Sequence, residues 1–292
     1  MCGIVGYVGK NNGTPYILDG LEALEYRGYD SAGLSLLHIG KINTTKVVGR
    51  VEALRKELTE SKNESHLAVG HTRWATHGGV LHKNAHPHQD NSGEFSVIHN
   101  GIIENYQDIK AFLTTKGYVF YSDTDTEVIP NLVHYHFQKL GDVEQAFIAS
   151  IDALHGAYGI AMITTNSPDT IFCAKLSSPL AIGVGTGEMY IGSDAIPMAP
   201  HTQDVVFLQD NDIAIVTSSG YRVIDGNTKK LLHRPSEHIE IESSDSDSGD
   251  YPDFMSKEMH EAPQTVRSAM LGRLRVEENL VKLGGLELVQ GQ

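Results

Sequence analysis

The chain has 292 residues, 40% hydrophobic and 21% charged, the ordinary balance of a globular protein with a sizeable core. Asp and Glu number 37 against 23 Lys and Arg, so the formal charge of −14 argues against nucleic acid or an anionic membrane as the main partner. With two cysteines, no basic leader and no apolar run of membrane-spanning length, the sequence predicts a cytoplasmic protein without disulfides, signal peptide or transmembrane helix.

The first third of the chain mixes short strands with helices. Residues 4–8 form a β-rich run, and a helix is predicted over 14–24 with Thr14 as N-cap and Pro15 as first helical residue. The sequence His99-Asn100-Gly101 is a turn-prone close to a strand. The further predicted elements are two strands around the Gly40 turn in 34–48, a helix at 51–58, and strands at 67–74 and 94–98.

Helices and strands are segregated in the rest of the chain. Apolar residues three or four apart predict helices over residues 106–116, 125–140 and 143–154. Short apolar strands separated by turn residues follow at 158–164, 170–174, 181–184, 189–192, 205–208, 213–217 and 221–224. This grouping indicates an α+β protein, a four-layer αββα sandwich of two stacked, mainly antiparallel sheets with helices on the outer faces.

Composition changes near residue 240. Residues 240–250 are acidic and serine-rich, with almost nothing to bury, which is typical of a linker or surface loop. A helical stretch carrying Phe254, Met255, Met259, Val266 and Met270 follows it. The predicted division is therefore one domain over residues 1–239, then a linker and the beginning of a further part over 240–292, although that last helix is also compatible with docking on the first domain.

Cys2 is the residue in the sequence that most clearly suggests a catalytic role. Removal of Met1 would make it N-terminal, and its free α-amino group would have a pKa of about 7.7–8.0, suitable for a general base. That amine, directly or through one water, can take the thiol proton, and the thiolate can attack a carbonyl carbon. Taken alone, a Met-Cys start is more often a casually placed cysteine, so the hypothesis depends on the rest of the chain.

Other residues fit a free amino acid as the substrate. The planar guanidinium of Arg73 suits an α-carboxylate, and the carboxylate of Asp125 suits an α-ammonium group. The side-chain amide of Asn100 and the backbone N–H of Gly101 can stabilise the oxyanion formed by attack on an amide carbonyl. Taken singly, such residues are more often surface charges or a hairpin turn.

Three further features have simpler interpretations. His71, His77, His82, His86 and His88 invite a metal-site hypothesis, but their spacing matches no closed ligand set and no Cys pair accompanies them, so no metal is expected. No cofactor is expected either. His86 and His99 are instead expected to satisfy hydrogen bonds near the site. Cys173 lies in a predicted strand and is expected to be a buried apolar residue. The glycine-rich residues 183–187 lack a following P-loop lysine and are interpreted as a β-turn.

A series of motifs carries a resemblance to a known family. Together they resemble the glutaminase domain of the glutamine–fructose-6-phosphate aminotransferases, class II glutamine amidotransferases within the N-terminal nucleophile hydrolases. The match runs from Cys2 to about residue 274. The motifs occur in family order at residues 2–6, 24–33, 70–78, 84–88, 99–105 and 122–127.

The resemblance implies a function and further site residues. It implies release of ammonia from L-glutamine through a thioester on Cys2, with Arg27 organising the site. Backbone amides of Thr76 and His77 would complete the carboxylate site, and Trp74 would belong to a loop that closes over glutamine. In a full-length homo-oligomeric enzyme, a sugar isomerase half that this chain lacks would use the ammonia to convert fructose 6-phosphate to glucosamine 6-phosphate.

Two alternatives are carried from the sequence. One is the glutaminase half of an amidophosphoribosyltransferase or asparagine synthetase, which share the nucleophile; residues 26–31 and 257–263 favour the hexosamine family instead. The other is a non-catalytic regulator that binds an amino acid. Retention of Met1 on the purified protein would favour that second alternative, because the base would then be blocked.

Overall fold

The computed structural model describes residues 2–58, 64–75, 78–240, 251–252, 254–270, 274–275 and 280–281. Contacts divide the chain into two compact units, Met1–Glu242 and Ser243–Gln292. The predicted functional division at residues 239 and 240 stays a prediction. Among the described helices, none is both long and apolar enough to cross a membrane.

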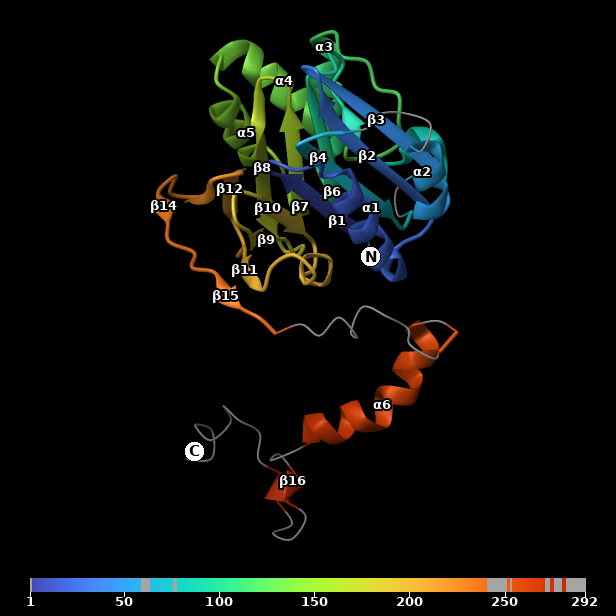
Figure 1. Cartoon of the computed structure of the whole chain (residues 1–292). Helices are drawn as coiled ribbons and strands as arrows, with labels where there is room; N and C mark the ends of the chain where they lie inside the picture. Colours follow the sequence, from blue (N-terminus) through green and yellow to red (C-terminus); the bar gives the residue numbers. More distant parts are fainter. Residues whose placement is uncertain are drawn as a thin grey trace. The chain divides into compact units, whose positions relative to one another are not determined.

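The first unit contains two large sheets whose named strands pair antiparallel (Figure 1). In spatial order over the described residues, the first sheet contains β15 (Glu237–His238), β11 (Asp204–Phe207), β9 (Ala181–Val184), β10 (Met189–Gly192), β1 (Gly3–Val8), β4 (Leu67–Arg73), β2 (Ser31–His38) and β3 (Lys41–Val48). The second contains β14 (Leu231–Leu232), β13 (Gly220–Asp225), β12 (Asp212–Thr217), β8 (Ser167–Leu176), β7 (Gly156–Thr164), β6 (Phe95–Ile103) and β5 (His88–Gln89).

The helices fall into two groups along the first unit. Early in the chain are α1 (Thr14–Ala23), α2 (Val51–Leu58) and the short 3-10 turns η1 (Glu25–Arg27) and η2 (His82–Asn84). Later come α3 (Tyr106–Thr115), α4 (Val128–Leu140), α5 (Val143–Asp152) and η3 (Ile196–Met198). The second unit contains α6 (Phe254–Met270) and a small hairpin of β16 (Leu274–Arg275) and β17 (Leu280–Val281).

Strand β1 connects two hydrophobic cores because its side chains alternate between its faces. Ile4 and Val8 pack in the core between the sheets, whereas Val5 and Tyr7 pack in an outer core with residues of α1 and α2. All six residues of β1 are buried, which explains its continuous run of apolar and glycine residues.

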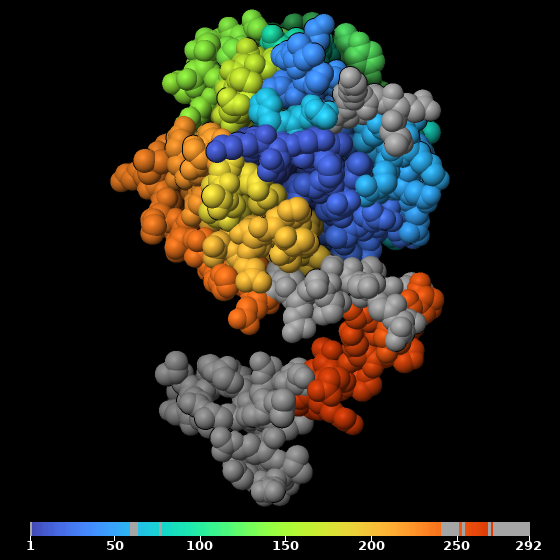
Figure 2. Space-filling view, in the orientation of Figure 1, coloured from blue at the N-terminus to red at the C-terminus, as the bar shows by residue number. Residues whose placement is uncertain are grey.

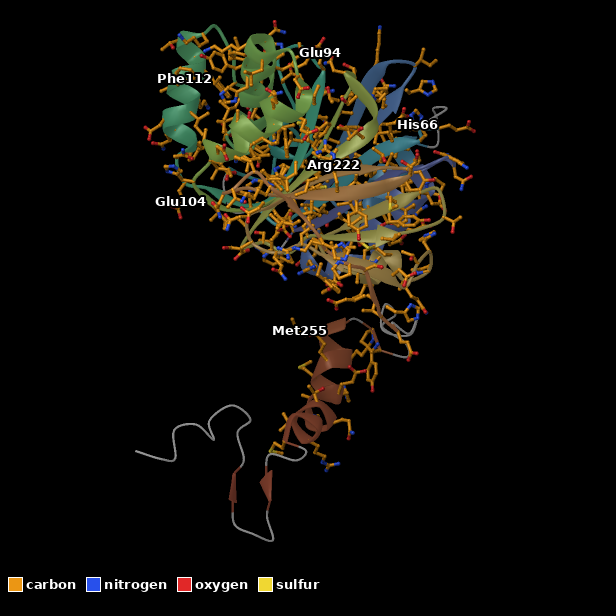
Figure 3. The ribbon with its side chains drawn as sticks, turned by 90° about the vertical axis from the view of Figure 1, so that its left-hand side faces the viewer. His66, Glu94, Glu104, Phe112, Arg222 and Met255 are labelled. Carbon is orange, nitrogen blue, oxygen red and sulfur yellow. The ribbon has the colours of Figure 1, made fainter. Side chains whose placement is uncertain are left out.

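A further core lies between the second sheet and α3, α4 and α5. The order of layers is therefore α1 and α2, first sheet, second sheet, then α3 to α5, which confirms the predicted αββα sandwich. In Figure 3, Phe112 marks α3 in the helical layer outside the second sheet.

One predicted N-cap and one predicted helix start are wrong. Gly13, not Thr14, is the N-cap of α1, because the Asn12 side chain accepts a hydrogen bond from the Thr14 amide (3.1 Å) and so satisfies it at the first helical residue. The helix predicted from residue 125 begins at Val128. The carboxylates of Asp125 and Glu127 accept hydrogen bonds from the backbone amides of Ile103, Tyr121 and Ser122, which holds this segment as a turn.

The predicted strand over residues 94–98 is too short. Strand β6 continues through His99, Asn100 and Gly101 to Ile103, paired with β7 down to Gly156. Gly101 has φ +128°, and a Cβ added there would lie 2.0 Å from the Ala157 carbonyl oxygen. Glycine therefore allows a strand to pass where a turn was expected.

Candidate active site

Cys2 lies immediately before β1, beside the end of β4. The antiparallel pairing of Gly3 with Thr72 brings Cys2 to the turn after Arg73. The Trp74 amide donates a hydrogen bond to Cys2 Sγ (3.2 Å). Burial raises the pKa of the Cys2 thiol, although the Trp74 amide and the nearby Arg73 charge act in the opposite direction. The thiol is therefore protonated at neutral pH, and a nucleophilic role would require a base beside it.

Asn100 and Gly101 reach Cys2 from the second sheet. Asn100 Nδ2 donates a hydrogen bond to the Cys2 carbonyl oxygen (3.0 Å), and Gly101 is the next residue of β6. The Asn100 amide has two N–H groups, and the second has no partner among the described residues. The two proposed oxyanion donors thus come from adjacent positions of a strand that faces the thiol-bearing residue.

The segment that carries Arg73 and Trp74 is fixed by Asp30. The Asp30 amide donates to the Arg73 carbonyl oxygen (3.0 Å), and the Asp30 carboxylate accepts from the Ala75 amide (2.8 Å). A Cβ added at Gly28 would lie 2.8 Å from the Arg73 carbonyl carbon and 2.9 Å from the Trp74 nitrogen. Only a glycine lets the chain approach the peptide whose N–H binds the thiol.

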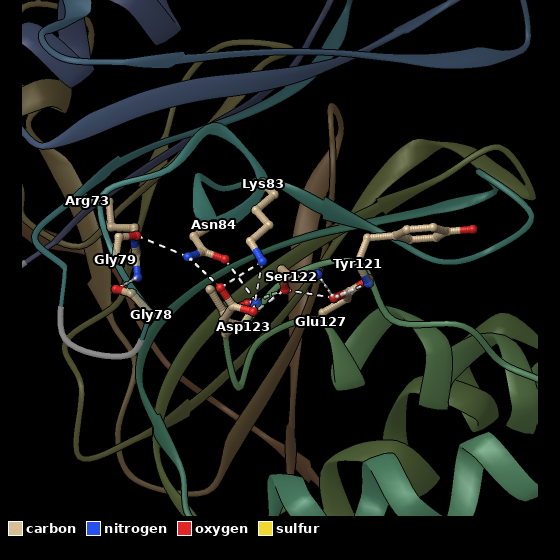
Figure 4. Close-up of polar contacts among 10 residues, drawn as sticks. Arg73, Gly78, Gly79, Lys83, Asn84, Tyr121, Ser122, Asp123 and Glu127 are labelled. Atoms are coloured by element: carbon tan, nitrogen blue, oxygen red, sulfur yellow. Dashed lines mark hydrogen bonds and ion pairs between the residues drawn. The ribbon is translucent and has the colours of Figure 1, made fainter.

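The Arg73 guanidinium binds a loop that is held by further hydrogen bonds (Figure 4). It donates to the carbonyl oxygens of Gly79 (3.3 Å) and Gly78 (3.4 Å), and Asn84 Nδ2 donates to the same Gly79 oxygen (3.0 Å). The Asn84 side chain also accepts from the Asp123 amide (2.9 Å). Burial lowers the pKa of Arg73, and the charges of Cys2, Asp30 and Asp125 oppose this effect.

Asp125 is buried at the end of β6. Its Oδ2 accepts a hydrogen bond from the Ile103 amide (2.7 Å). The same turn is held by Glu127, whose carboxylate accepts from the Ser122 amide and hydroxyl (both 2.7 Å) (Figure 4). The turn before α4 therefore holds the Asp125 carboxylate against the end of β6, the strand that carries Asn100 and Gly101.

Trp74 and Arg27 occupy different positions around this centre. The Trp74 side chain is 46% exposed and meets the Tyr29 ring edge-on at 5.7 Å. Arg27 Nη1 contacts the Asp194 carboxylate and the Ser193 carbonyl oxygen, each at 3.2 Å. Within the described residues no polar contact joins Arg27 to Cys2, so Arg27 holds the turn after β10. In the same turn, the Ser193 hydroxyl accepts a hydrogen bond from the Ile4 amide (3.0 Å). The predicted residues Thr76 and His77 lie outside the described residues.

Figure 2 shows the N-terminal segment (blue) at the surface of the first unit, next to cyan and yellow segments.

Sequence reasoning gave no role to Asp30, Ser193 and Asp194, although Asp30 lies inside a quoted motif. Only its place in that motif, two residues after Gly28, could have singled out Asp30 in the sequence. Ser193 and Asp194 lie far along the chain, and only the pairing of β1 with β10 brings them to the site.

Four histidines form a buried polar cluster behind the site. The rings of His71 and His86 lie 4.2 Å apart, and those of His86 and His88 lie 4.8 Å apart. His99 Nδ1 bonds the Thr126 hydroxyl (2.9 Å). Burial lowers the pKa of all four imidazoles. Within the described part of the chain, no group of three or more His, Cys, Asp or Glu side chains is arranged to hold a metal ion.

Lys46 of β3 approaches this cluster from the edge of the first sheet. Burial lowers the pKa of its ammonium group to about 8, with only partial compensation from Glu127, and its charge acts on His88. The Lys46 side chain has no hydrogen-bond or ion-pair partner among the described residues. A partly buried, unpaired charge destabilises the folded state.

Replacing Lys46 by methionine is expected to stabilise the chain at neutral pH. The folded pKa of Lys46 lies below the unfolded value of about 10.4, so below pH 8 both states are charged and the folding penalty is complete. As pH rises from about 8 to 10.4, folded Lys46 loses its proton first and the penalty disappears. The expected gain is about 2 kcal/mol at pH 7, because some solvent reaches the side chain, and near zero above pH 10.5.

Urea denaturation of both proteins at pH 7 and pH 10.5 measures this difference. Lys41→Met is the matched control, because Lys41 is an exposed residue of the same strand. A stabilisation by Lys46→Met that is equal at both pH values would contradict the assignment of the effect to a buried charge.

Known proteins resemble this chain in sequence and in fold. A family model described as a glutamine amidotransferase domain matches residues 71–198. A solved structure, the glutamine phosphoribosylpyrophosphate amidotransferase of B. subtilis complexed with ADP and GMP, aligns with a TM-score of 0.67 at 23% identity. The alignment covers 78% of this chain and 50% of that one. The chain thus contains a domain of the class II glutamine amidotransferases, and its first unit has the fold of the solved amidotransferase.

Curated relatives identify the group within this class. Glutamine–fructose-6-phosphate aminotransferase (isomerizing) of Clostridium tetani is 39% identical over 292 residues, covering 100% of this chain and 47% of that protein. The Chlorobaculum tepidum protein of the same name is 42% identical over 292 residues, covering 98% and 47%. The chain thus spans about half the length of these relatives and corresponds to their glutamine amidotransferase portion.

Proposed function

We propose that this chain hydrolyses L-glutamine to glutamate and ammonia through a thioester on Cys2. The observation that carries the proposal is the position of Cys2 between two sets of backbone and side-chain donors. The Trp74 amide lies 3.2 Å from the sulfur, and Asn100 lies against the Cys2 carbonyl group on the other side.

The proposed reaction has two stages. The α-amino group of Cys2, free after removal of Met1, takes the thiol proton, and the sulfur bonds to the amide carbon of glutamine. Asn100 Nδ2 and the Gly101 amide stabilise the oxyanion. The C–N bond breaks as the amine returns the proton to the leaving ammonia. Water then attacks the thioester, which gives glutamate and restores the thiol.

Selection of glutamine uses charges at both ends of the amino acid. Arg73, with the Thr76 and His77 amides, binds the α-carboxylate, and Asp125 binds the α-ammonium group. Trp74 belongs to the loop that closes over the substrate and excludes water. Arg27 organises the site from the Asp194 side. The atoms balance with water alone, so the reaction needs no cofactor.

The proposed role of the whole enzyme extends this activity. Its further half would use the ammonia to convert fructose 6-phosphate to glucosamine 6-phosphate in the cytoplasm, as a homo-oligomer. The names of the curated relatives support this proposal. Residues 1–239 would form the glutaminase domain, and residues 240–292 would lead towards the isomerase half.

Covalent labelling tests the nucleophile directly. The chain with Met1 removed, incubated with a glutamine analogue that carries an electrophilic carbon at the amide position, is expected to gain one label on the Cys2 peptide. Cys173 is fully buried and burial raises its pKa, so it provides an internal control that stays unlabelled. Labelling of Cys173 instead of Cys2, or glutamine hydrolysis at full rate with Met1 retained, would refute the proposal.

A further inference from the structure

His71 is a residue of β4, and its completely buried imidazole contacts β6. Its Nε2 is 2.9 Å from Asn100 Oδ1 and 3.1 Å from the His99 carbonyl oxygen. Asn100, in turn, lies between His71 and Cys2. The imidazole therefore contacts the proposed oxyanion donor from the side away from the thiol.

The hydrogen-bond acceptors around the His71 ring determine which ring nitrogen carries the proton. The Cys2 carbonyl oxygen only accepts hydrogen bonds, so the Asn100 side chain must turn its Nδ2 towards Cys2 and its Oδ1 towards His71. The His99 carbonyl oxygen is also an acceptor. Both partners of His71 Nε2 thus require a hydrogen on that nitrogen, and the tautomer follows without ambiguity.

The other nitrogen is held without a proton. His71 Nδ1 is buried and has no hydrogen-bond partner among the described residues. Among the described residues, the titratable groups around the ring are His86, His88, His99 and Arg73, and none offers an anion to stabilise an imidazolium. Burial lowers the pKa of His71 to about 3, so the ring stays neutral throughout the physiological range.

We propose that neutral His71 is a positioning residue, which orients the Asn100 amide so that its unpaired N–H faces the developing oxyanion. The proposal rests on the proposed glutaminase function and adds a residue that touches neither substrate nor thiol. Without the Nε2–H donor, Asn100 Oδ1 would be buried and unpaired, and the amide would rotate or tilt to recover a donor. A tilted amide would stabilise the transition state less than the aligned amide does, while binding of the substrate in the ground state would change little.

Two substitutions separate positioning from packing. His71→Leu fills the space but removes the donor, and turnover is expected to fall about 10- to 100-fold with KM changed less than about twofold, since losing a whole oxyanion donor costs about 10²–10³. His71→Gln places a side-chain N–H near the Nε2 position and is expected to restore turnover to within about fivefold of the parent. His88→Leu is the matched control, because His88 is also buried but bonds Thr124 and not Asn100.

A spectroscopic measurement tests the placement without substrate. In the full chain labelled with ¹⁵N-histidine, His71 is expected to show a protonated Nε2 and an unprotonated Nδ1, unchanged from pH 6 to pH 8. In His71→Leu, but not in His71→Gln, the Asn100 side-chain amide resonances are expected to shift and to exchange faster with water.

The outcomes distinguish the two levels of the proposal. A parent chain that fails to hydrolyse glutamine refutes the proposed function, and the tautomer and Asn100 resonances then still decide the positioning. An Nδ1–H tautomer, unshifted Asn100 resonances in His71→Leu, or equal turnover of His71→Leu and the parent overturns the role of His71. Equal losses in His71→Leu and His88→Leu also overturn it, because packing alone would then explain the effect.

Discussion

Replacing Cys2 by alanine in the chain with Met1 removed is expected to lower glutamine turnover by at least about 10⁴-fold, the order of loss seen when a covalent nucleophile is removed. The reason is that only the sulfur forms the acyl intermediate, and the remaining donors can merely polarise the amide. Alanine removes a partly buried thiol that accepts one amide hydrogen bond, so the fold should persist. Ammonia release measures turnover, and thermal unfolding monitors the fold.

Cys173→Ala supplies the matched control for that substitution. Cys173 lies in β8 opposite Ala161 and Ala214, completely buried between the two sheets. Its loss should lower stability by about 1 kcal/mol through a small cavity and leave turnover unchanged. Retention of activity in Cys2→Ala, together with a loss in Cys173→Ala, would show that Cys173 and not Cys2 is the nucleophile.

Replacing Gly101 by alanine is expected to destabilise the chain by about 2–5 kcal/mol and to lower turnover at least about 100-fold. Positive φ costs an L-residue about 1–2 kcal/mol, and forcing a methyl group into a filled space adds about 1–3 kcal/mol. The added Cβ would lie 2.0 Å from the Ala157 carbonyl oxygen, so β6 must separate from β7 and move the proposed oxyanion amide.

Gly117→Ala separates these two causes. Gly117 also has a positive φ, +91°, but a Cβ there would have nothing within 4 Å. Its substitution should cost only about 1 kcal/mol and leave turnover intact. If the two alanine variants were equally stable in urea denaturation, backbone conformation alone would account for Gly101, and the clash with β7 would be excluded as the cause.

The sequence predicted the architecture because the local patterns of apolar and turn residues agree with the layers into which the helices and strands pack. Alternation and turn residues located most strands, and helical periodicity located α1 to α5. The central strand β1 was recognisable although it shows little alternation, because burial on both faces favours a continuous apolar run. Local patterns failed where tertiary contacts replace them, as at Val128, whose helix begins late because two carboxylates before it bond to other segments.

For the site, the sequence predicted the chemical groups better than their partners. Cys2, Asn100, Gly101 and Arg73 were selected by their chemistry, and the structure brings Asn100 and the segment after Arg73 to Cys2. Their functional roles stay predictions. The contact between Arg27 and Asp194 spans 167 positions, and the bond of His71 to Asn100 crosses from one sheet to the other. Neither leaves a periodic signal in a single chain.

The two-sided pairing of β1 has a consequence for how the protein reaches its native state. Val5 pairs with Gly70 on one side and with Gly192 on the other, so the central strand of the first sheet depends on partners very distant in sequence. Contacts of such high sequence separation are associated with slow folding. During synthesis, the thiol-bearing end of the chain must therefore wait for β10, and the contacts around Cys2 are expected to form among the last in the domain.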